Sequence, residues 1–420
     1  MAGSLKEKIE RGIEMSVINE SMSSRQMLDI LVAKNMEDAR QAKKNGELVC
    51  WSSSIAPCEF CEVMGIHTVY PENHVVGIAA RKGAPELLEY AESKGYSNDI
   101  CGYARANLAY MDVQKCVSEE MPLPDLVLLC NNICETLLKW YENIAYELNI
   151  PLLIVDVPYN HDNEITQENV DYVKAQFETI IEQLEEITGK EFDYNKFEEV
   201  MKVASQNASD WYEATSLCSA TPSPLSGFDM FNYMALIVCM RGKPECGMTF
   251  RKLKEELLQK IENGECGLKG AEENYRIMWD GIACWPYLSH TYKILKNYGV
   301  NMTGSTYPSA WALRYTPGNL EEMARAYTGM GNNLSLQGQI DLRKSIIQDT
   351  KCDGVVMHMN RSCKMCDFLQ YEVGQELQKS LGVPITTFDG DQADPRNYSK
   401  AQYETRIEAL VEMMDQKKNL

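Results

Sequence analysis

The sequence lacks the features that would place it in a membrane or in a secretory pathway. Across its 420 residues, no stretch approaches the roughly 18 uncharged apolar residues of a membrane span, and the densest apolar run, FNYMALIVCM, is too short. The opening segment, MAGSLKEKIERG, is charged from residue 6 and has no apolar centre, unlike a secretory signal. We therefore expect a cytoplasmic protein that does not cross a membrane.

Basic residues are scarce as well. The chain has 41 Lys and Arg against 61 Asp and Glu, which gives a formal net charge of −20. A nucleic-acid-binding protein needs a basic face to meet the phosphates, and no cluster of Lys and Arg is dense enough to form one. Nucleic acid is therefore not an expected partner.

Common catalytic motifs are also absent. No G-x-x-x-x-G-K-[ST] occurs, so we expect no ATP hydrolysis through a P-loop. The one glycine-rich candidate, TGMGNNL, lacks the third glycine of a dinucleotide fingerprint and follows no predicted strand. The five histidines are scattered, and no G-x-S-x-G motif marks a nucleophilic serine.

Cysteine, in contrast, is abundant, with 15 residues in the chain. An odd number without a secretion signal argues against a disulfide framework, which leaves reduced thiols, metal ligands or catalysis. Free cysteine also packs as a small apolar residue. We assign Cys218, Cys239, Cys246 and Cys266 to packing, because they lie in segments with helical patterns.

The pattern along the chain predicts four segments. Residues 1–46 are expected to form a polar, helical N-terminal segment. A first α/β lobe follows over 47–163, where short apolar strands (ELVCWSSSIA, HTVYP, PDLVLLC, PLLIVDVPY) alternate with amphipathic helices. Residues 164–275 are predicted to form a helical connecting region, in which one helix ends at Gly189 as a C-cap.

The last segment, 276–420, is predicted to form a second α/β lobe with strands at GIACWPYL, VNMTGSTYP, CDGVVMHM and PITTFDG, and a final helix from about Ser399 to Lys417. The fold class is therefore α/β, with two doubly wound, Rossmann- or flavodoxin-like parallel sheets joined by helices. Such folds bind ligands at the carboxyl ends of their strands, so we expect a site in the cleft between the lobes.

Three cysteines share one structural situation. Cys101 lies in DICGYAR, Cys134 in LLCNNICETLLKW and Cys363 in MHMNRSCKMC, each where a loop or strand gives way to a helix. At a helix N-terminus the unpaired N–H groups and the helix dipole favour the thiolate. Thiolates are the ligands that zinc and iron–sulfur clusters require.

Spacing alone leaves the role of the cysteines open. Two C-x-x-C pairs occur, Cys58 with Cys61 and Cys363 with Cys366, and they lie far apart in the chain. A zinc site, a redox dithiol and simple packing are each compatible with the residues. A metal cluster with widely separated ligands is a further interpretation.

Four stretches together resemble one known family. CGYAR, PDLVLLCNNIC…KWYE, MNRSCK and FDGDQADPR are similar to the 2-hydroxyacyl-CoA dehydratase family, which also contains benzoyl-CoA reductase subunits. The resemblance runs from ELVCWSSS to ALVEMM. It is strongest to the active-site (alpha) subunits of the (R)-2-hydroxyacyl-CoA dehydratases of amino-acid-fermenting anaerobes.

The resemblance implies a 4Fe–4S cluster held by three cysteines, which match Cys101, Cys134 and Cys363 here. The fourth iron would stay open to water and then to substrate, as in other catalytic metal sites. The family pattern does not require the remaining cysteines of these segments, so the roles of Cys58, Cys61, Cys130 and Cys366 stay open.

Two further residues carry over by motif. Ser54 ends WSSS after the first strand, and Glu72 lies in VYPEN after the second. The resemblance implies that Ser54 donates a hydrogen bond to the thioester carbonyl and that Glu72 holds the substrate hydroxyl or moves its proton. Without the resemblance, Ser54 is interpreted as a turn residue and Glu72 as an exposed acid after a proline.

The resemblance also implies a mechanism and partners. One electron added to the thioester gives a ketyl radical that expels the α-hydroxyl, and after loss of the β-proton the electron returns. The product is an (E)-2-enoyl-CoA. The expected partners are a smaller, related beta subunit forming a heterodimer, a separate ATP-hydrolysing iron–sulfur activator, and the 2-hydroxyacyl-CoA substrate. An acyl-CoA reductase subunit and a non-catalytic, metal-stabilised structural subunit are the alternatives. The sequence does not determine the acyl side chain.

Overall fold

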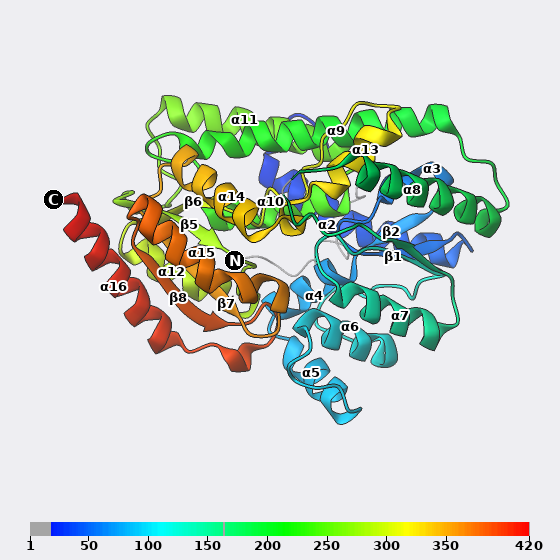
Figure 1. The fold of residues 1–420 in the computed structure, drawn as a ribbon, viewed down its shortest axis with the longest axis horizontal. Helices are drawn as coiled ribbons and strands as arrows, with labels where there is room; N and C mark the ends of the chain where they lie inside the picture. Colours follow the sequence, from blue (N-terminus) through cyan, green and yellow to red (C-terminus); the bar gives the residue numbers. More distant parts are fainter. Residues whose placement is uncertain (1–17, 163, 420) are drawn as a thin grey trace.

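The computed structural model describes residues 18–162 and 164–419 and has the predicted α/β architecture, with two four-stranded parallel sheets in that part of the chain (Figure 1). The first sheet has the order β2-β1-β3-β4, formed by β1 (Val49–Ser52), β2 (His67–Val69), β3 (Leu126–Cys130) and β4 (Leu152–Val155). The second has the order β6-β5-β7-β8, formed by β5 (Tyr275–Asp280), β6 (Val300–Ser305), β7 (Gly354–Asn360) and β8 (Ile385–Gly390).

Helices connect the parallel strands, as the crossover geometry of such sheets requires. The first lobe contains α3 (Cys58–Met64), α4 (Pro71–Ala80), α5 (Ala84–Ser93), α6 (Gly102–Val113) and α7 (Thr136–Leu148). The second contains α12 (Leu288–Asn297), α13 (Leu320–Thr328), α14 (Leu336–Asp349), α15 (Lys364–Leu381) and α16 (Lys400–Lys418), with 3₁₀ turns η2 (Trp285–Tyr287), η3 (Gly331–Asn333) and η4 (Pro395–Asn397).

Helices cover both faces of the second sheet, because successive residues of a strand point to opposite sides. Met278, Val355 and Met357 pack in one apolar cluster with residues of α14 and α15. Trp279 follows Met278 in β5, and Val356 follows Val355 in β7. Both belong to the main core, together with residues of α16. Burial on both faces explains why the strands form continuous apolar runs in the sequence.

The helical segment consists of α8 (Gln167–Thr188), α9 (Tyr194–Ser216), η1 (Leu217–Ser219), α10 (Gly227–Cys239) and α11 (Pro244–Glu262). Gly189 ends α8 in the left-handed conformation, with φ of 66°, so the predicted C-cap is confirmed. Helices α9 and α11 pack against each other and lie along the top of Figure 1. Helix α8 contacts β4 and α13, and α10 contacts β6, so the segment touches both lobes.

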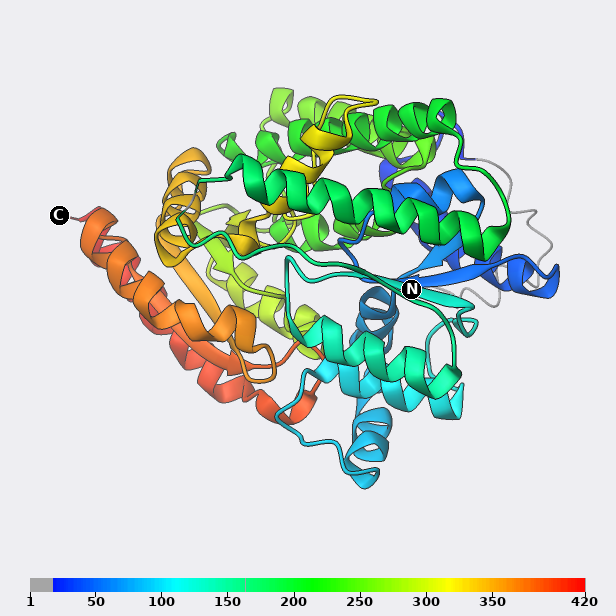
Figure 2. The same ribbon diagram turned by 45° about the vertical axis from the view of Figure 1, so that its right-hand side comes forward.

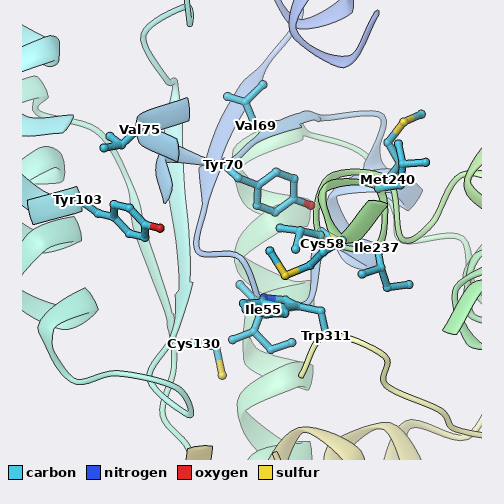
Figure 3. Close-up of a cluster of buried hydrophobic side chains, with 14 of the residues drawn as sticks. Ile55, Cys58, Val69, Tyr70, Val75, Tyr103, Cys130, Ile237, Met240 and Trp311 are labelled. Atoms are coloured by element: carbon cyan, nitrogen blue, oxygen red, sulfur yellow. The ribbon is translucent and has the colours of Figure 1, made fainter. Parts of the chain in front are cut away.

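The N-terminal helix α2 (Ser24–Lys44) packs on α10, α11 and β2. The helical structure predicted for residues 1–17 lies outside the described residues. In the turned view of Figure 2, the orange and red elements of the second lobe lie on the left and meet the cyan elements of the first lobe, where Arg105 pairs with Asp394. Figure 3 shows Cys58, Tyr70 and Ile237 in one buried cluster, which joins the first lobe to α10. The division of the chain into four segments, with boundaries after residues 46, 163 and 275, stays a prediction.

One predicted strand is wrong. The segment GIACWPYL, residues 281–288, forms a turn and a 3₁₀ turn, and the strand is β5 just before it. Pro286 has no N–H to donate, so it does not fit a central strand. In the sequence, the charged residues Arg276 and Asp280 interrupt the apolar pattern of β5. Both are buried because Arg276 Nη2 donates to Cys218 O (2.6 Å) and Asp280 accepts from Arg343 Nε (2.9 Å).

Among the described residues, no helix combines the length and the apolar character that crossing a bilayer requires.

Candidate functional site

A cavity of about 520 Å³ lies at the carboxyl ends of both sheets. Residues directly after β1, β3, β5, β6, β7 and β8 line it, namely Ser54, Ile133, Gly281, Thr306, Cys363 and Gln392. The α/β pattern predicts a ligand site at this edge of each sheet. The cavity therefore lies where the sequence placed the cleft between the lobes.

The structure brings Cys101, Cys134 and Cys363 to the wall of this one cavity, although they lie in different parts of the chain. Cys101 is the N-cap of α6 and Cys363 the N-cap of α15. Cys134 stands just before α7, between β3 and the helix. Helix N-termini from both lobes thus present three thiols to the same space.

These thiols influence one another. Burial raises the pKa of Cys101, and the charges of Cys363 and Cys134 raise it further. Burial also raises the pKa of Cys134, with Cys363 as the next cause. For Cys363 the hydrogen bond with Cys366 is the first cause of its raised pKa, followed by burial. Without a positively charged partner in this cavity, burial and mutual repulsion thus favour three neutral thiols over three thiolates.

The donor set fits an iron–sulfur cluster. Within residues 18–162 and 164–419, no three His, Cys, Asp or Glu side chains lie close enough together to hold a single metal ion. The three thiols line one cavity instead, and thiolates are the ligands that hold iron–sulfur clusters. Gln392 Nε2 donates to Cys101 Sγ (3.3 Å), the type of N–H···S contact that tunes such clusters.

Ser54 and Glu72 lie in direct contact. Ser54 is in the turn after β1, and Glu72 is the second residue of α4, after Pro71. Glu72 Oε1 accepts from Ser54 N (3.0 Å). Glu72 is only 9% exposed, so its interpretation as an exposed acid is wrong. Burial raises the pKa of Glu72, although hydrogen bonds from Ser54 and Tyr141 oppose the shift.

The sequence analysis predicted no site role for Tyr141 or for Gln392. Tyr141 is fully buried in α7, and its hydroxyl donates to Glu72 Oε2 (3.2 Å). It belongs to the KWYE stretch, whose signal was only its part in the family resemblance. Gln392 lies within FDGDQADPR, which the sequence analysis used only for the family resemblance. Asp391 accepts from the backbone of Ala393 (2.8 Å), so this acid organises the turn.

The other cysteines differ in their surroundings. Cys366 lines the cavity beside Cys363. Cys130 is buried at the end of β3, and burial raises its pKa to about 12. Burial likewise raises the pKa of Cys58 to about 12, and Cys61 is fully buried beside Cys50. The raised pKa of Cys58 disfavours its thiolate, and neither Cys58 nor Cys61 lines the cavity.

The two buried histidines serve the scaffold. His74 Nε2 lies 2.8 Å from Glu119 O, and burial lowers the pKa of His74 to about 4. His358 Nδ1 lies 2.6 Å from Ile282 O, and burial lowers the pKa of His358 to about 4 as well. Neither side chain lines the cavity.

Comparison with known proteins shows which family and which relatives this chain resembles. The model of the 2-hydroxyglutaryl-CoA dehydratase D-component family matches residues 53–414. The (R)-2-hydroxyisocaproyl-CoA dehydratase alpha subunit of Clostridioides difficile is 48% identical, over 96% of this chain and 99% of the relative. The (R)-phenyllactyl-CoA dehydratase alpha subunit of Clostridium sporogenes is 46% identical, over 90% and 93%. A benzoyl-CoA reductase chain of Thauera aromatica is 25% identical, over 93% and 94%.

Proposed function

The chain belongs to the 2-hydroxyglutaryl-CoA dehydratase D-component family, and from this premise we propose that it is the alpha subunit of an (R)-2-hydroxyacyl-CoA dehydratase. The enzyme is a hydro-lyase, which removes water from a 2-hydroxyacyl-CoA to give an (E)-2-enoyl-CoA. One observation carries the proposal: the three thiols and the Ser54–Glu72 pair line a single cavity between the two sheets.

The reaction is chemically difficult, since the β-hydrogen is barely acidic and the hydroxyl leaves from the α-carbon. A side-chain base alone does not overcome this barrier. We propose that Cys101, Cys134 and Cys363 hold a 4Fe–4S cluster, which supplies a single electron and an iron position open to the substrate oxygen. The placement of the three thiols at helix N-termini around one cavity supports this ligand set.

Ser54 and Glu72 act on the substrate in this proposal. The hydroxyl of Ser54 donates to the thioester carbonyl, where negative charge develops during the reaction. Glu72 accepts a hydrogen bond from the substrate hydroxyl or carries its proton. Its burial and raised pKa support this role, because a carboxyl group with a raised pKa holds a proton closer to neutral pH. Tyr141 positions Glu72 from the opposite side.

We propose two protein partners. The relatives are named alpha subunits, which supports a complex with a beta subunit. The second proposed partner is a separate ATP-hydrolysing activator that delivers the electron, and the absence of a P-loop from this sequence is compatible with that division of roles.

The cofactor is tested by substituting two neighbouring cysteines. We would purify the chain with its partner under strict anaerobiosis and measure iron, zinc and acid-labile sulfide for the wild type, Cys363→Ser and Cys366→Ser. We expect about four irons and four sulfides per chain in the wild type and in Cys366→Ser, and a loss or breakdown of the cluster in Cys363→Ser. Cys366 is the matched control because it lines the same cavity beside Cys363.

Other outcomes separate the alternatives. Zinc in the wild type, or no metal and no effect of Cys363→Ser, would refute the cluster. Loss of iron from Cys366→Ser would make Cys366 a ligand. A dehydratase turns over many times for each ATP, whereas an acyl-CoA reductase consumes ATP throughout. Full activity of the assembled complex with Ser54→Ala would refute the catalytic role of this chain.

A further inference from the structure

One wall of the cavity is a single face of helix α10. Phe231, Met234, Ala235 and Val238 line the cavity, and their spacing of three, four and seven residues places them on one side of the helix. All four side chains are apolar. Phe231, Met234 and Val238 are buried, whereas Ala235 is only half-buried. The small side chain of Ala235 therefore leaves open space in the middle of an apolar wall.

This wall extends from the thiols to Glu72. At one end, the ring of Phe231 lies 5.9 Å from Trp285 and 6.0 Å from Tyr307. Trp285 Nε1 donates to the hydroxyl of Tyr103 (2.7 Å), two residues after Cys101. At the other end, Val238 precedes Cys239, which is close enough to Glu72 for that charge to contribute to its raised pKa, after burial and Cys58. A substrate held between the thiols and Glu72 would therefore occupy a cavity of which this face of α10 is one wall.

Positive charge is scarce in the wall of the cavity. Among the described residues that line it, the cations are Arg314 and Arg343. Arg314 is exposed and stacks over the ring of Tyr212, 4.8 Å from its centroid. Arg343 Nε pairs with Asp280 Oδ2 (2.9 Å), and its Nη1 donates to Gln339 Oε1 (2.6 Å). Asp280 thus neutralises Arg343, while Arg314 is exposed to solvent. A carboxylate packed against the apolar face of α10 would lose its hydration there.

We propose that this face of α10 binds the acyl side chain, that the substrate is a 2-hydroxyacyl-CoA with an uncharged, apolar side chain, and that Ala235 sets the size of side chain the enzyme accepts. The proposal rests on the dehydratase function and adds the substrate class to it. An apolar side chain replaces water against the wall residues, and its binding is favoured by the surface that both bury.

The test uses substrate preference in the complete enzyme. The wild-type chain, assembled with its partner and activated, is assayed with the CoA esters of (R)-lactate, (R)-2-hydroxyisocaproate, (R)-phenyllactate and (R)-2-hydroxyglutarate. We expect kcat/KM for at least one of the two bulky apolar esters to exceed that for the dicarboxylic ester by at least about 100-fold, because a carboxylate against the apolar face of α10 loses its hydration.

Variants at position 235 test the role of the wall. Ala235→Phe fills the space beside the acyl chain, so the ratio of kcat/KM for the phenyllactyl ester to that for the lactyl ester should fall by at least about 10-fold. Ala235→Gly should keep or raise this ratio. Asn232→Leu is the matched control, because Asn232 is on the same helix but does not line the cavity. A ratio of two substrates does not depend on how much of a variant is folded.

The outcomes distinguish this proposal from the one on which it rests. If the wild type dehydrates none of the esters, the dehydratase function fails. If it dehydrates them but prefers the dicarboxylic ester, the apolar substrate class is wrong. If Ala235→Phe and Asn232→Leu leave the phenyllactyl-to-lactyl ratio equally unchanged, Ala235 does not limit the acyl side chain. A fall of the ratio in Ala235→Phe alone supports the proposal.

Discussion

At the scale of single residues, Glu72 accepts hydrogen bonds from Ser54 N and from the hydroxyl of Tyr141 while it is only 9% exposed. These partners hold its carboxyl group in a fixed position, with one oxygen toward the turn after β1 and the other toward α7. Burial disfavours the ionised form, and the two hydrogen bonds favour it. The raised pKa shows that burial dominates.

The raised pKa of Glu72 predicts a pH-dependent cost in stability. The folded chain binds this proton more tightly than the unfolded chain, whose pKa is near 4.5, so the free energy of unfolding decreases as the pH rises above that value. Glu72→Gln removes the charge. We expect its free energy of unfolding, relative to the wild type, to increase from about pH 5 to about pH 8, and kcat to fall by roughly 10²-fold or more.

Urea unfolding of both proteins at the two pH values, with assays of the assembled complex, measures both effects. A stability difference that does not change with pH would contradict the raised pKa. Unchanged kcat would exclude a role of Glu72 in proton transfer or substrate binding.

At the scale of elements, the close approach of α6 to the loops after β7 and β8 shapes the site. Gly102 N donates to Ser362 Oγ (2.9 Å), next to Cys101 and Cys363. A Cβ atom at Gly102 would lie 2.8 Å from Asp391 Oδ1 and 3.1 Å from the Cβ of Ala393. The absent side chain therefore lets the N-terminus of α6 reach the second lobe.

Gly102→Ala should force this contact apart. We expect a loss of about 1–3 kcal/mol in the free energy of unfolding, as for other overpacked sites, and a lower iron content. Gly242→Ala is the control, since the nearest atom to its added Cβ is Val200 Cγ1 at 3.4 Å, an ordinary contact. Thermal unfolding and iron analysis of both variants test this, and equal behaviour of the two would contradict it.

Sequence patterns predicted most of these elements, because buried parallel strands are apolar and helix ends carry recognisable caps. The patterns failed at β5, where Arg276 and Asp280 find buried partners that are distant in sequence. The contact of Tyr141 with Glu72 was unpredictable for the same reason, since the two residues are 69 positions apart. The resemblance supplied the site residues, and their chemical roles remain predictions.

At the scale of the whole molecule, ionic contacts join the two lobes beside the cavity. Arg105 of α6 is fully buried; its Nη1 pairs with Glu92 Oε1 (2.6 Å) and its Nη2 with Asp394 Oδ2 (3.3 Å). Arg396 pairs with the same two acids but is 43% exposed. Glu92 and Arg105 belong to the first lobe, and Asp394 and Arg396 to the second, so this network holds the lobes together.

Arg105→Met should lower the free energy of unfolding by about 3 kcal/mol. This value is at the low end for removing one partner of a buried ion pair, because Arg396 still pairs with Asp394. Arg396→Met, at the exposed side of the same network, should cost less than about 1 kcal/mol. Urea unfolding of the two variants provides the comparison. A larger effect of Arg396→Met would place the important contact at the surface.

The proposed thiol ligands come from distant parts of the chain, with Cys101 and Cys134 in the first lobe and Cys363 after β7. A ribosome makes the first two long before the third. A chain that ends before Cys363 therefore carries only two of the three proposed ligands. Under the proposed ligand set, such a chain would lack a complete site for a cluster.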